Sequence, residues 1–201
     1  MTQAAQLIDQ MRTASVRAAD ADSLRGFEGR AAATYFGSLK SLLDPRWAFQ
    51  GRAYHPPPDA FNALLSFGYA LLLKDLTAMI QIVGLDPYLG CFHAIEYGRP
   101  SLTLDLMEEF RAFADRLVLS MINRSQLTVN DFVEREGGAV TLRDDSRKAV
   151  LVAYQERKQE EVKHPLLEQP IPLGLVPFVQ ARILARAVRG EIEGYLPFVS
   201  K

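Results

Sequence analysis

The sequence predicts an all-α protein that folds as a single helical domain over residues 1–201. Three observations favour this class. Apolar residues recur three or four positions apart along most of the chain, which is the spacing of one helix face. Turn residues gather between these stretches, and runs with the alternation of a strand are few. The chain is also long enough to bury one sizeable core.

The first half of the chain predicts three helices. Helical spacing covers residues 2–18 and about 23–43, and the stretch DPRWAFQGRAYHPPPD that follows is expected to be a loop. Asp59 is a good N-cap for a helix that runs to about Val83 and ends at Gly84. The apolar run AFNALLSFGYALLL in this helix is interrupted by polar residues and is too short to span a bilayer, so we interpret it as a buried core helix.

The second half begins with a turn-rich segment, GLDPYLGCFHAIEYGRP, in which a short helical piece is expected around His93. A long helix is predicted over about Ser101–Asn123, followed by a short helix and a small hairpin or strand at 137–142. Two further helices are predicted, at about 146–162 and 176–189. The connector between them, HPLLEQPIPLG, is expected to be extended because prolines interrupt it.

Composition limits the classes of function. The formal net charge is −1, so a nucleic-acid partner must be held by local patches and not by a general basic field. Cys91 is the only cysteine, which excludes internal disulfides and a thiolate zinc cage and suits a reducing cytosol. The first residues contain no apolar core of a signal peptide. We therefore expect a cytoplasmic protein without a membrane partner.

One imidazole and several carboxylates are candidates for a metal site. Glu28 begins a helix face that is otherwise apolar, and His93 stands in the apolar string GCFHAI. Asp105 and Glu108 are three positions apart, so they project side by side from one helix. Each also has an ordinary interpretation: a wet acid near a helix start, or a hydrogen-bonded core histidine. Taken together, without thiolates, they suit Mg²⁺ or Mn²⁺, which would activate a hydroxyl and neutralise a phosphoryl group.

Basic residues form two helical sets. Arg182, Arg186 and Arg189 share one face of the last predicted helix, and a second set at 143–148 flanks the start of the helix before it. Either set could follow a phosphate backbone. A solvated helix face is the alternative for both.

Five strings occur in an order that resembles a known family: LRGFEGRAAATYF, PPPDAFNALLSFGYALL, GLDPYLGCFH, GRPSLTLDLMEEFR and QARILARAVRGEIEGYLPF. They are similar to the CRISPR-associated integrase-endonuclease of spacer acquisition, the adaptation module, in its helical C-terminal catalytic domain. The resemblance covers 23–198, which leaves 1–22 as an N-terminal helical segment. The central block, from GLDP through FH to DLMEEFR, is the most specific part.

The resemblance implies a site and an activity. In that family one divalent ion, Mg²⁺ or Mn²⁺, is bound by a Glu, a His and a further acid, which correspond here to Glu28, His93 and Glu108. Asp105 matches an acid that assists the site. The implied enzyme is a metal-dependent DNA endonuclease and integrase, in which a DNA 3′-hydroxyl attacks a repeat phosphodiester by transesterification. Arg99 is a candidate phosphate contact, together with the arginines of the last helix.

The implied partners are double-stranded and branched DNA, a small ferredoxin-like adaptation protein, and a second copy in a homodimer. Family members normally begin with a β-rich domain that builds the dimer, and this sequence opens on a helical segment. We therefore expect a naturally short or fragmentary product, or the tail of a fusion or split reading frame. An alternative function is a catalytically silent helical DNA-binding or scaffold subunit. A more distant one is a metal phosphohydrolase of small molecules.

Overall fold

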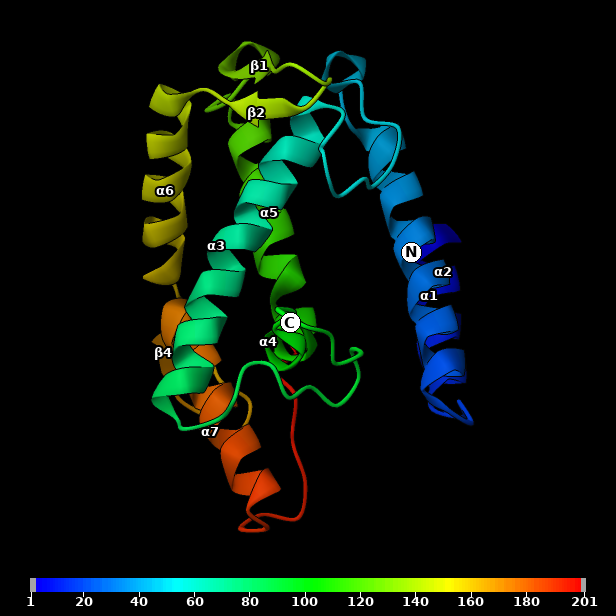
Figure 1. The fold of residues 1–201 in the computed structure, drawn as a ribbon, viewed down its shortest axis with the longest axis vertical. Coiled ribbons are helices and arrows are strands. Elements are labelled where there is room, and N and C mark those ends of the chain that lie inside the picture. The colour runs from blue at the N-terminus through cyan, green and yellow to red at the C-terminus, as the bar shows by residue number, and fades with distance from the viewer. Residues whose placement is uncertain (1–2, 200–201) are drawn as a thin grey trace. The chain divides into compact units, whose positions relative to one another are not determined.

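The structure, a computed structural model, describes residues 3–199. Among these residues two compact units are found. Unit 1 comprises 3–63 and 132–142, and unit 2 comprises 64–131 and 143–199. The α-helices of both are labelled in Figure 1. The single domain expected over 1–201 stays a prediction.

Unit 1 contains two helices that pack against each other, α1 (Gln3–Ser15) and α2 (Ala21–Leu42). The side chain of Asp20 accepts a hydrogen bond from the N–H of Ser23 at 2.7 Å, which caps the start of α2. The helices predicted over 2–18 and 23–43 are thus confirmed to within a few residues, and Thr2 lies outside the described residues.

Aromatic residues form the core of unit 1 around the 3₁₀ turn η1 (Pro45–Trp47). Trp47 meets Phe132 edge to face with 5.9 Å between ring centroids, and Phe49 meets Phe61 in the same way at 4.7 Å. The loop before α3 is ordered by the fully buried Asn62, whose side-chain amide donates to Asp59 at 2.7 Å.

A short hairpin completes unit 1. Strand β1 (Phe132–Glu134) pairs antiparallel with β2 (Val140–Leu142), with Phe132 opposite Leu142. The connecting turn passes through Gly137 and Gly138, whose φ angles of 86° and 79° favour glycine. The hairpin predicted at 137–142 is confirmed, although its first strand begins earlier.

The helix α3 (Ala60–Ile82) supplies most of the core of unit 2. Asp59 caps it by accepting a hydrogen bond from the N–H of Asn62 at 2.8 Å, as predicted. It lies beside α5 (Arg111–Asn123) (Figure 1), and the two helices meet at Gly68, where an added Cβ would make ordinary van der Waals contact with Val118 at 3.6 Å. Its buried residues in unit 2 include Leu64, Leu65, Leu72, Leu76 and Ile80.

By length and composition alone, the whole of α3 could cross a membrane, whereas the apolar run quoted from the sequence is only its first part. Of its most apolar stretch, 44% is buried inside the structure. That burial fits the core helix predicted from the sequence.

The rest of unit 2 is formed by α6 (Asp144–Lys158), a second hairpin, and α7 (Val176–Val188). Asp75 on α3 accepts hydrogen bonds from Tyr154 at 2.9 Å and Lys158 at 2.7 Å, which fastens α6 to α3. Strand β3 (Glu161–Lys163) pairs antiparallel with β4 (Pro170–Pro172), and the 3₁₀ turn η4 (Leu173–Leu175) leads into α7.

The all-α class predicted from the sequence is wrong, because the residues at 3–199 contain two antiparallel hairpins in a largely helical chain. The predicted helix at 146–162 ends at Lys158, and the residues after it pair with part of the proline-rich connector instead. The segment 170–172 carries two prolines, and an edge strand tolerates them because it needs fewer N–H donors.

The long helix predicted over Ser101–Asn123 is also interrupted. It consists of α4 (Ser101–Met107), the 3₁₀ turn η2 (Glu108–Phe110) and α5. The short helical piece expected around His93 is absent, because the backbone N–H groups there bond to a side chain instead of to helical carbonyls.

Candidate metal-ligand cluster in unit 2

The loop at 84–100 folds over the start of α4. Pro100 gives that helix no side-chain cap, so the N–H groups of Leu102 and Thr103 donate to the carbonyl of Pro87, at 2.9 and 3.3 Å. The hydroxyl of Ser101 donates to the carbonyl of Ala94 at 2.8 Å. The loop is therefore fixed against the helix at two points on either side of His93.

Asp105 organises the centre of this loop. Its Oδ2 accepts the N–H groups of Cys91 and Phe92, at 2.6 and 3.0 Å. Its Oδ1 accepts the N–H of His93 at 2.8 Å and lies 2.7 Å from Nδ1 of the same residue. Gly90 makes room for this arrangement, because a Cβ there would lie 2.9 Å from Oδ2 of Asp105 and 2.7 Å from the backbone of Ser101.

The electrostatics of Asp105 favour its ionised form. Burial alone would raise its pKa, but the hydrogen bonds from the Phe92 and His93 amides, the His93 ring and the Cys91 amide outweigh burial, so the pKa is lowered. Because an ionised carboxylate only accepts, Nδ1 of His93 carries the proton. The lone pair of His93 is then on Nε2, the arrangement typical of a histidine that binds a metal ion.

Glu108, the acid expected to be a ligand, lies at the first position of η2. The guanidinium of Arg111 donates to both of its carboxylate oxygens at 2.7 Å each. The same guanidinium lies 5.3 Å from the ring centre of Tyr69, whose hydroxyl donates to Asp115 at 2.6 Å. Glu108 is thus oriented and charge-balanced by a side chain that is itself supported by α3 and α5.

Glu109 has no role predicted from the sequence, yet its carboxylate is held by three hydrogen-bond donors. It accepts hydrogen bonds from the hydroxyl of Tyr195, from the N–H of Phe198 at 2.7 Å and from Nε2 of Gln180 at 2.9 Å. Burial raises its pKa, against the effect of these donors. The sequence does contain a signal that Glu109 faces the core. It follows Leu106 by three residues and precedes Phe113 by four, so helical spacing places it on the same face as these apolar residues.

Glu28, the third expected ligand, belongs to α2 in unit 1 and is exposed. Gly26 and Gly29, on either side of it, have no neighbouring atom within 4 Å of an added Cβ, so no close backbone approach explains these glycines here. Among residues 3–199, no group of three His, Cys, Asp or Glu side chains is arranged to hold a metal ion. The structure brings together His93 and Asp105, and the joint site of Glu28, His93 and Glu108 stays a prediction.

The arginines of α7 lie along a cavity of about 390 Å³ that also includes Ile82 and Val83 from the end of α3. Glu191 pairs with two of them, with Arg186 at 3.2 Å and with Arg189 at 2.5 Å. Arg182 lies over the ring of Phe178 at 5.8 Å. The three predicted arginines therefore lie along one cavity, but two of them, Arg186 and Arg189, form ion pairs with Glu191.

The other basic candidates are paired locally. Arg99 lies 3.4 Å from Glu96 within the loop that contains His93. In the set at 143–148, Arg143 donates to the carbonyl of Asn130 at 2.9 Å, and Arg147 pairs with Asp144 at 3.2 Å. DNA contact by any of these residues stays a prediction.

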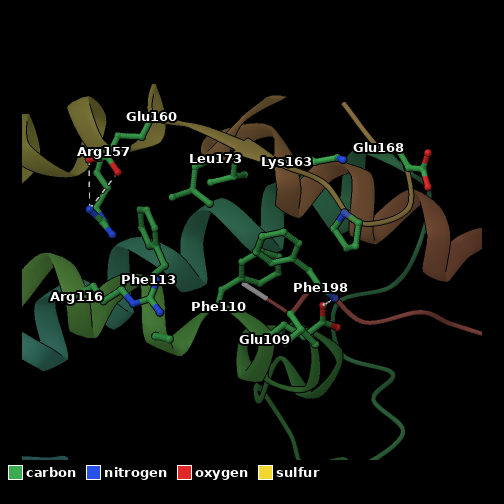
Figure 2. A pocket seen from close by; sticks show the side chains of 14 residues that line it. Glu109, Phe110, Phe113, Arg116, Arg157, Glu160, Lys163, Glu168, Leu173 and Phe198 are labelled. Atoms are coloured by element: carbon green, nitrogen blue, oxygen red, sulfur yellow. Dashed lines mark hydrogen bonds and ion pairs between the residues drawn. The ribbon is translucent and has the colours of Figure 1, made fainter. Parts of the chain in front are cut away.

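A larger cavity of about 590 Å³ lies between α5, β3 and the C-terminal residues (Figure 2). Phe110, Phe113 and Phe198 form apolar parts of its wall, and Arg157 pairs with Glu160 at its edge at 3.1 Å. Neither His93 nor the other predicted ligands line it. Glu109 does, so this cavity lies next to the turn that carries Glu108 and is distinct from the predicted site.

Comparison with known proteins identifies relatives for most of the chain. The family model described as CRISPR associated protein Cas1 matches residues 1–156. A CRISPR-associated endonuclease Cas1 of Moorella thermoacetica is 54% identical over 187 residues, which are 91% of this chain and 54% of that protein. The chain thus spans about half the length of this curated relative.

Solved structures agree. A Cas1 protein from Thermotoga maritima superposes with a TM-score of 0.81 at 28% identity, covering 91% of this chain and 57% of that one. A chain of a Cas6-RT-Cas1–Cas2 complex superposes with a TM-score of 0.85 at 26% identity, covering 94% of this chain and 21% of that one. Most of this chain therefore has a fold that is known from solved structures.

Proposed function

This chain belongs to the CRISPR-associated Cas1 family, and we propose that it is the helical catalytic part of a metal-dependent DNA endonuclease and integrase. In this proposal a DNA 3′-hydroxyl attacks a phosphodiester of the CRISPR repeat, so that a new P–O bond forms while the old one breaks and the repeat strand leaves with a free 3′-hydroxyl. Branched DNA would be nicked by the same in-line displacement with water as the nucleophile. The Cas1 relatives named as endonucleases support the endonuclease assignment.

The observation that carries the proposal is the contact between Asp105 and His93. Four hydrogen-bond contacts to one carboxylate fix the loop, the ring orientation and the tautomer of His93. Carboxylate–imidazole pairs of this kind orient ligand histidines and raise their basicity.

The donor set fits a divalent ion of the Mg²⁺ or Mn²⁺ class. His93 would offer Nε2, and Glu108 and Glu28 would offer carboxylate oxygens. When bound, such an ion would stabilise charge on the phosphoryl group and lower the pKa of the attacking hydroxyl.

The chain's own residues prepare this site. Asp105 holds the proton of His93 at Nδ1 and keeps Nε2 as the acceptor. Arg111 holds both oxygens of Glu108 and balances its charge. Each carboxylate oxygen accepts one of these hydrogen bonds and keeps a second lone pair, so Glu108 could bind a metal ion while both contacts with Arg111 remain.

The partners belong to the same proposal. Branched and double-stranded DNA would be the substrates, with the α7 arginines as phosphate contacts. A Cas2-like ferredoxin fold would be the protein partner, supported by the similarity to a chain of a complex that contains Cas2. Homodimerisation and a cytoplasmic location are proposed with them.

The proposal is tested by cleavage of a branched DNA duplex with Mn²⁺ present. We expect the unmodified chain to nick the branch, and His93→Ala to reduce the rate at least a hundredfold. His55→Ala removes a histidine from an exposed loop of unit 1 and should leave the rate unchanged. A chain that binds the DNA in a salt-sensitive way but cuts it no faster than His93→Ala would instead be a scaffold subunit.

A further inference from the structure

The side chains of two adjacent acids, Glu108 and Glu109, point in different directions from the α4–η2–α5 segment. Glu108 turns toward Arg111, and Glu109 turns toward the C-terminal residues. Successive side chains on a helix are about 100° apart, so neighbouring residues serve different surroundings. The 3₁₀ turn Glu108–Phe110 is the place where this divergence occurs.

The residues that bind Glu109 form a C-terminal strap, defined here as residues 195–198. No helix or strand of the described residues includes them, yet they are firmly held. Phe198 is 5% exposed and stacks on Phe110 with 6.0 Å between ring centres. Figure 2 shows Glu109 bonded to the backbone of Phe198, beside the ring of Phe110. The strap therefore contacts both residues that follow Glu108, namely Glu109 and Phe110.

A second set of contacts fixes the strap from the side of α7. Nδ1 of His164 lies 3.3 Å from the N–H groups of Leu166 and Leu167 and accepts from them, so the ring proton is on Nε2. That proton is directed to Oε1 of Gln180 at 3.2 Å, which turns the amide nitrogen of Gln180 toward Glu109. Gln180 and His164 are 0% and 1% exposed. The direction of the Gln180 amide is thus set by groups outside the strap.

The hydrogen-bond network around Glu109 is not explained by a gain in stability alone. Burying a carboxylate has a cost that hydrogen bonds offset only in part, and apolar side chains of similar size would pack at least as well. A half-buried carboxylate that is held by three donors does favour one backbone geometry, because those donors approach it from fixed positions. The geometry fixed here is that of the turn on which Glu108 stands.

We infer that Glu109 and Tyr195 are positioning residues, which hold η2 so that Glu108 is presented for metal binding. The inference rests on the proposed function, because it assumes that Glu108 is a ligand. It adds that the C-terminal strap, remote in sequence from every expected ligand, controls the affinity of the site.

The test is the affinity of the full chain for Mn²⁺, measured without DNA from the electron paramagnetic resonance signal of the free ion. Tyr195→Phe removes one hydroxyl from Glu109. Tyr154→Phe is the matched control, since it removes a hydroxyl of the same unit that donates to Asp75 and leaves every donor to Glu109 in place. Thermal unfolding of both variants shows how far each is destabilised.

We expect Tyr195→Phe to weaken Mn²⁺ binding about tenfold, the size of effect seen for residues that support metal ligands. Tyr154→Phe should leave the affinity unchanged at a similar loss of thermal stability. Glu109→Gln is a second variant, which places an amide against the same donors and should weaken binding at least as much.

The outcomes separate this inference from the proposed function. If His93→Ala abolishes Mn²⁺ binding while Tyr195→Phe and Glu109→Gln bind like Tyr154→Phe, the strap has no positioning role. If His93→Ala binds Mn²⁺ as tightly as the unmodified chain, the metal site itself is wrong. Equal weakening by both tyrosine variants would show that general stability is responsible, which would also overturn the inference.

Discussion

Nδ1 of His93 lies 2.7 Å from Oδ1 of Asp105, twelve residues further along the chain. The same carboxylate accepts three consecutive backbone N–H groups, those of residues 91–93. One side chain thus determines the path of a loop and the proton position on its histidine. Because Asp105 stands on a helix and His93 on a loop, the helix is the rigid reference for the candidate ligand.

Asp105→Asn should destabilise unit 2. The amide keeps one acceptor oxygen but directs an NH₂ group at backbone donors, so we expect a loss of about 2 kcal/mol in the free energy of unfolding. Urea denaturation at neutral pH measures it. Asp86→Asn is the control, because Asp86 is an exposed acid of the same loop that accepts a single N–H, from Tyr88. A loss for Asp105→Asn no larger than for Asp86→Asn would contradict the role given to the carboxylate.

The stability of the protein in acid should depend on the carboxylate of Asp105. The pKa of Asp105 is lowered in the fold relative to its usual 3.8. Its stabilisation is therefore fully present above that usual value and is lost as the pH falls through the lower folded pKa. The unmodified chain should lose stability more steeply than Asp105→Asn over this acidic range, in urea midpoints taken across a pH series. Parallel curves would refute the expectation. The pKa of Glu109 is raised, so its contribution to stability depends on pH in the opposite way. This contribution is fully present below pH 4.5 and is lost as the pH rises through the folded pKa.

Gly90→Ala should damage the loop by overpacking, without replacing any ionisable residue. An added Cβ would lie 2.7 Å from atoms of Ser101, which is fully buried and cannot move aside easily. We expect a loss of at least about 2 kcal/mol in unfolding free energy, as for other overpacked sites. Gly37→Ala, within α2 and with nothing near the added atom, should be neutral or stabilising by up to about 1 kcal/mol. Similar stabilities for the two variants would show that the loop adjusts freely.

Glu191→Gln should strengthen binding of duplex DNA. The carboxylate engages Arg186 and Arg189, so its removal leaves both guanidinium groups available to phosphates. We expect a two- to fivefold higher affinity at low salt in fluorescence anisotropy, and a steeper dependence on salt concentration.

The control for that measurement is Glu193→Gln, which changes the net charge equally from an exposed position two residues away. An equal gain from both variants would mean that general charge, and not the α7 arginines, sets the affinity. No gain at all would argue against this face as the DNA contact.

The helices could be predicted because their signals are local. Asp59 and Gly84 bracket α3 in the sequence, and Pro177 marks the start of α7. The all-α class failed because short strands depend on partners elsewhere: the pairing of Val162 with Ile171 adds little to either segment alone. Periodicity describes one element at a time, and a pairing of three residues leaves almost no periodic trace.

The candidate site was predictable only as a set of residue types. His93 and Asp105 could be selected from the sequence, but not the contact between them, since a helical piece was expected around His93 and the structure has an open loop. The interruption at Glu108–Phe110 could not be predicted either. Glu109 within it bonds to Tyr195 and Gln180, more than seventy residues away, and spacing within a helix carries no information about such partners.

The exposed thiol of Cys91 gives this loop a built-in attachment point. No second cysteine competes for a maleimide dye or a nitroxide, and the backbone N–H of the same residue donates to Asp105 at 2.6 Å. A probe bound there would sense rearrangement of the segment that carries His93 in an otherwise unmodified chain. Real-time fluorescence could then follow how ions or nucleic acid alter the loop, before any bond in the substrate is broken.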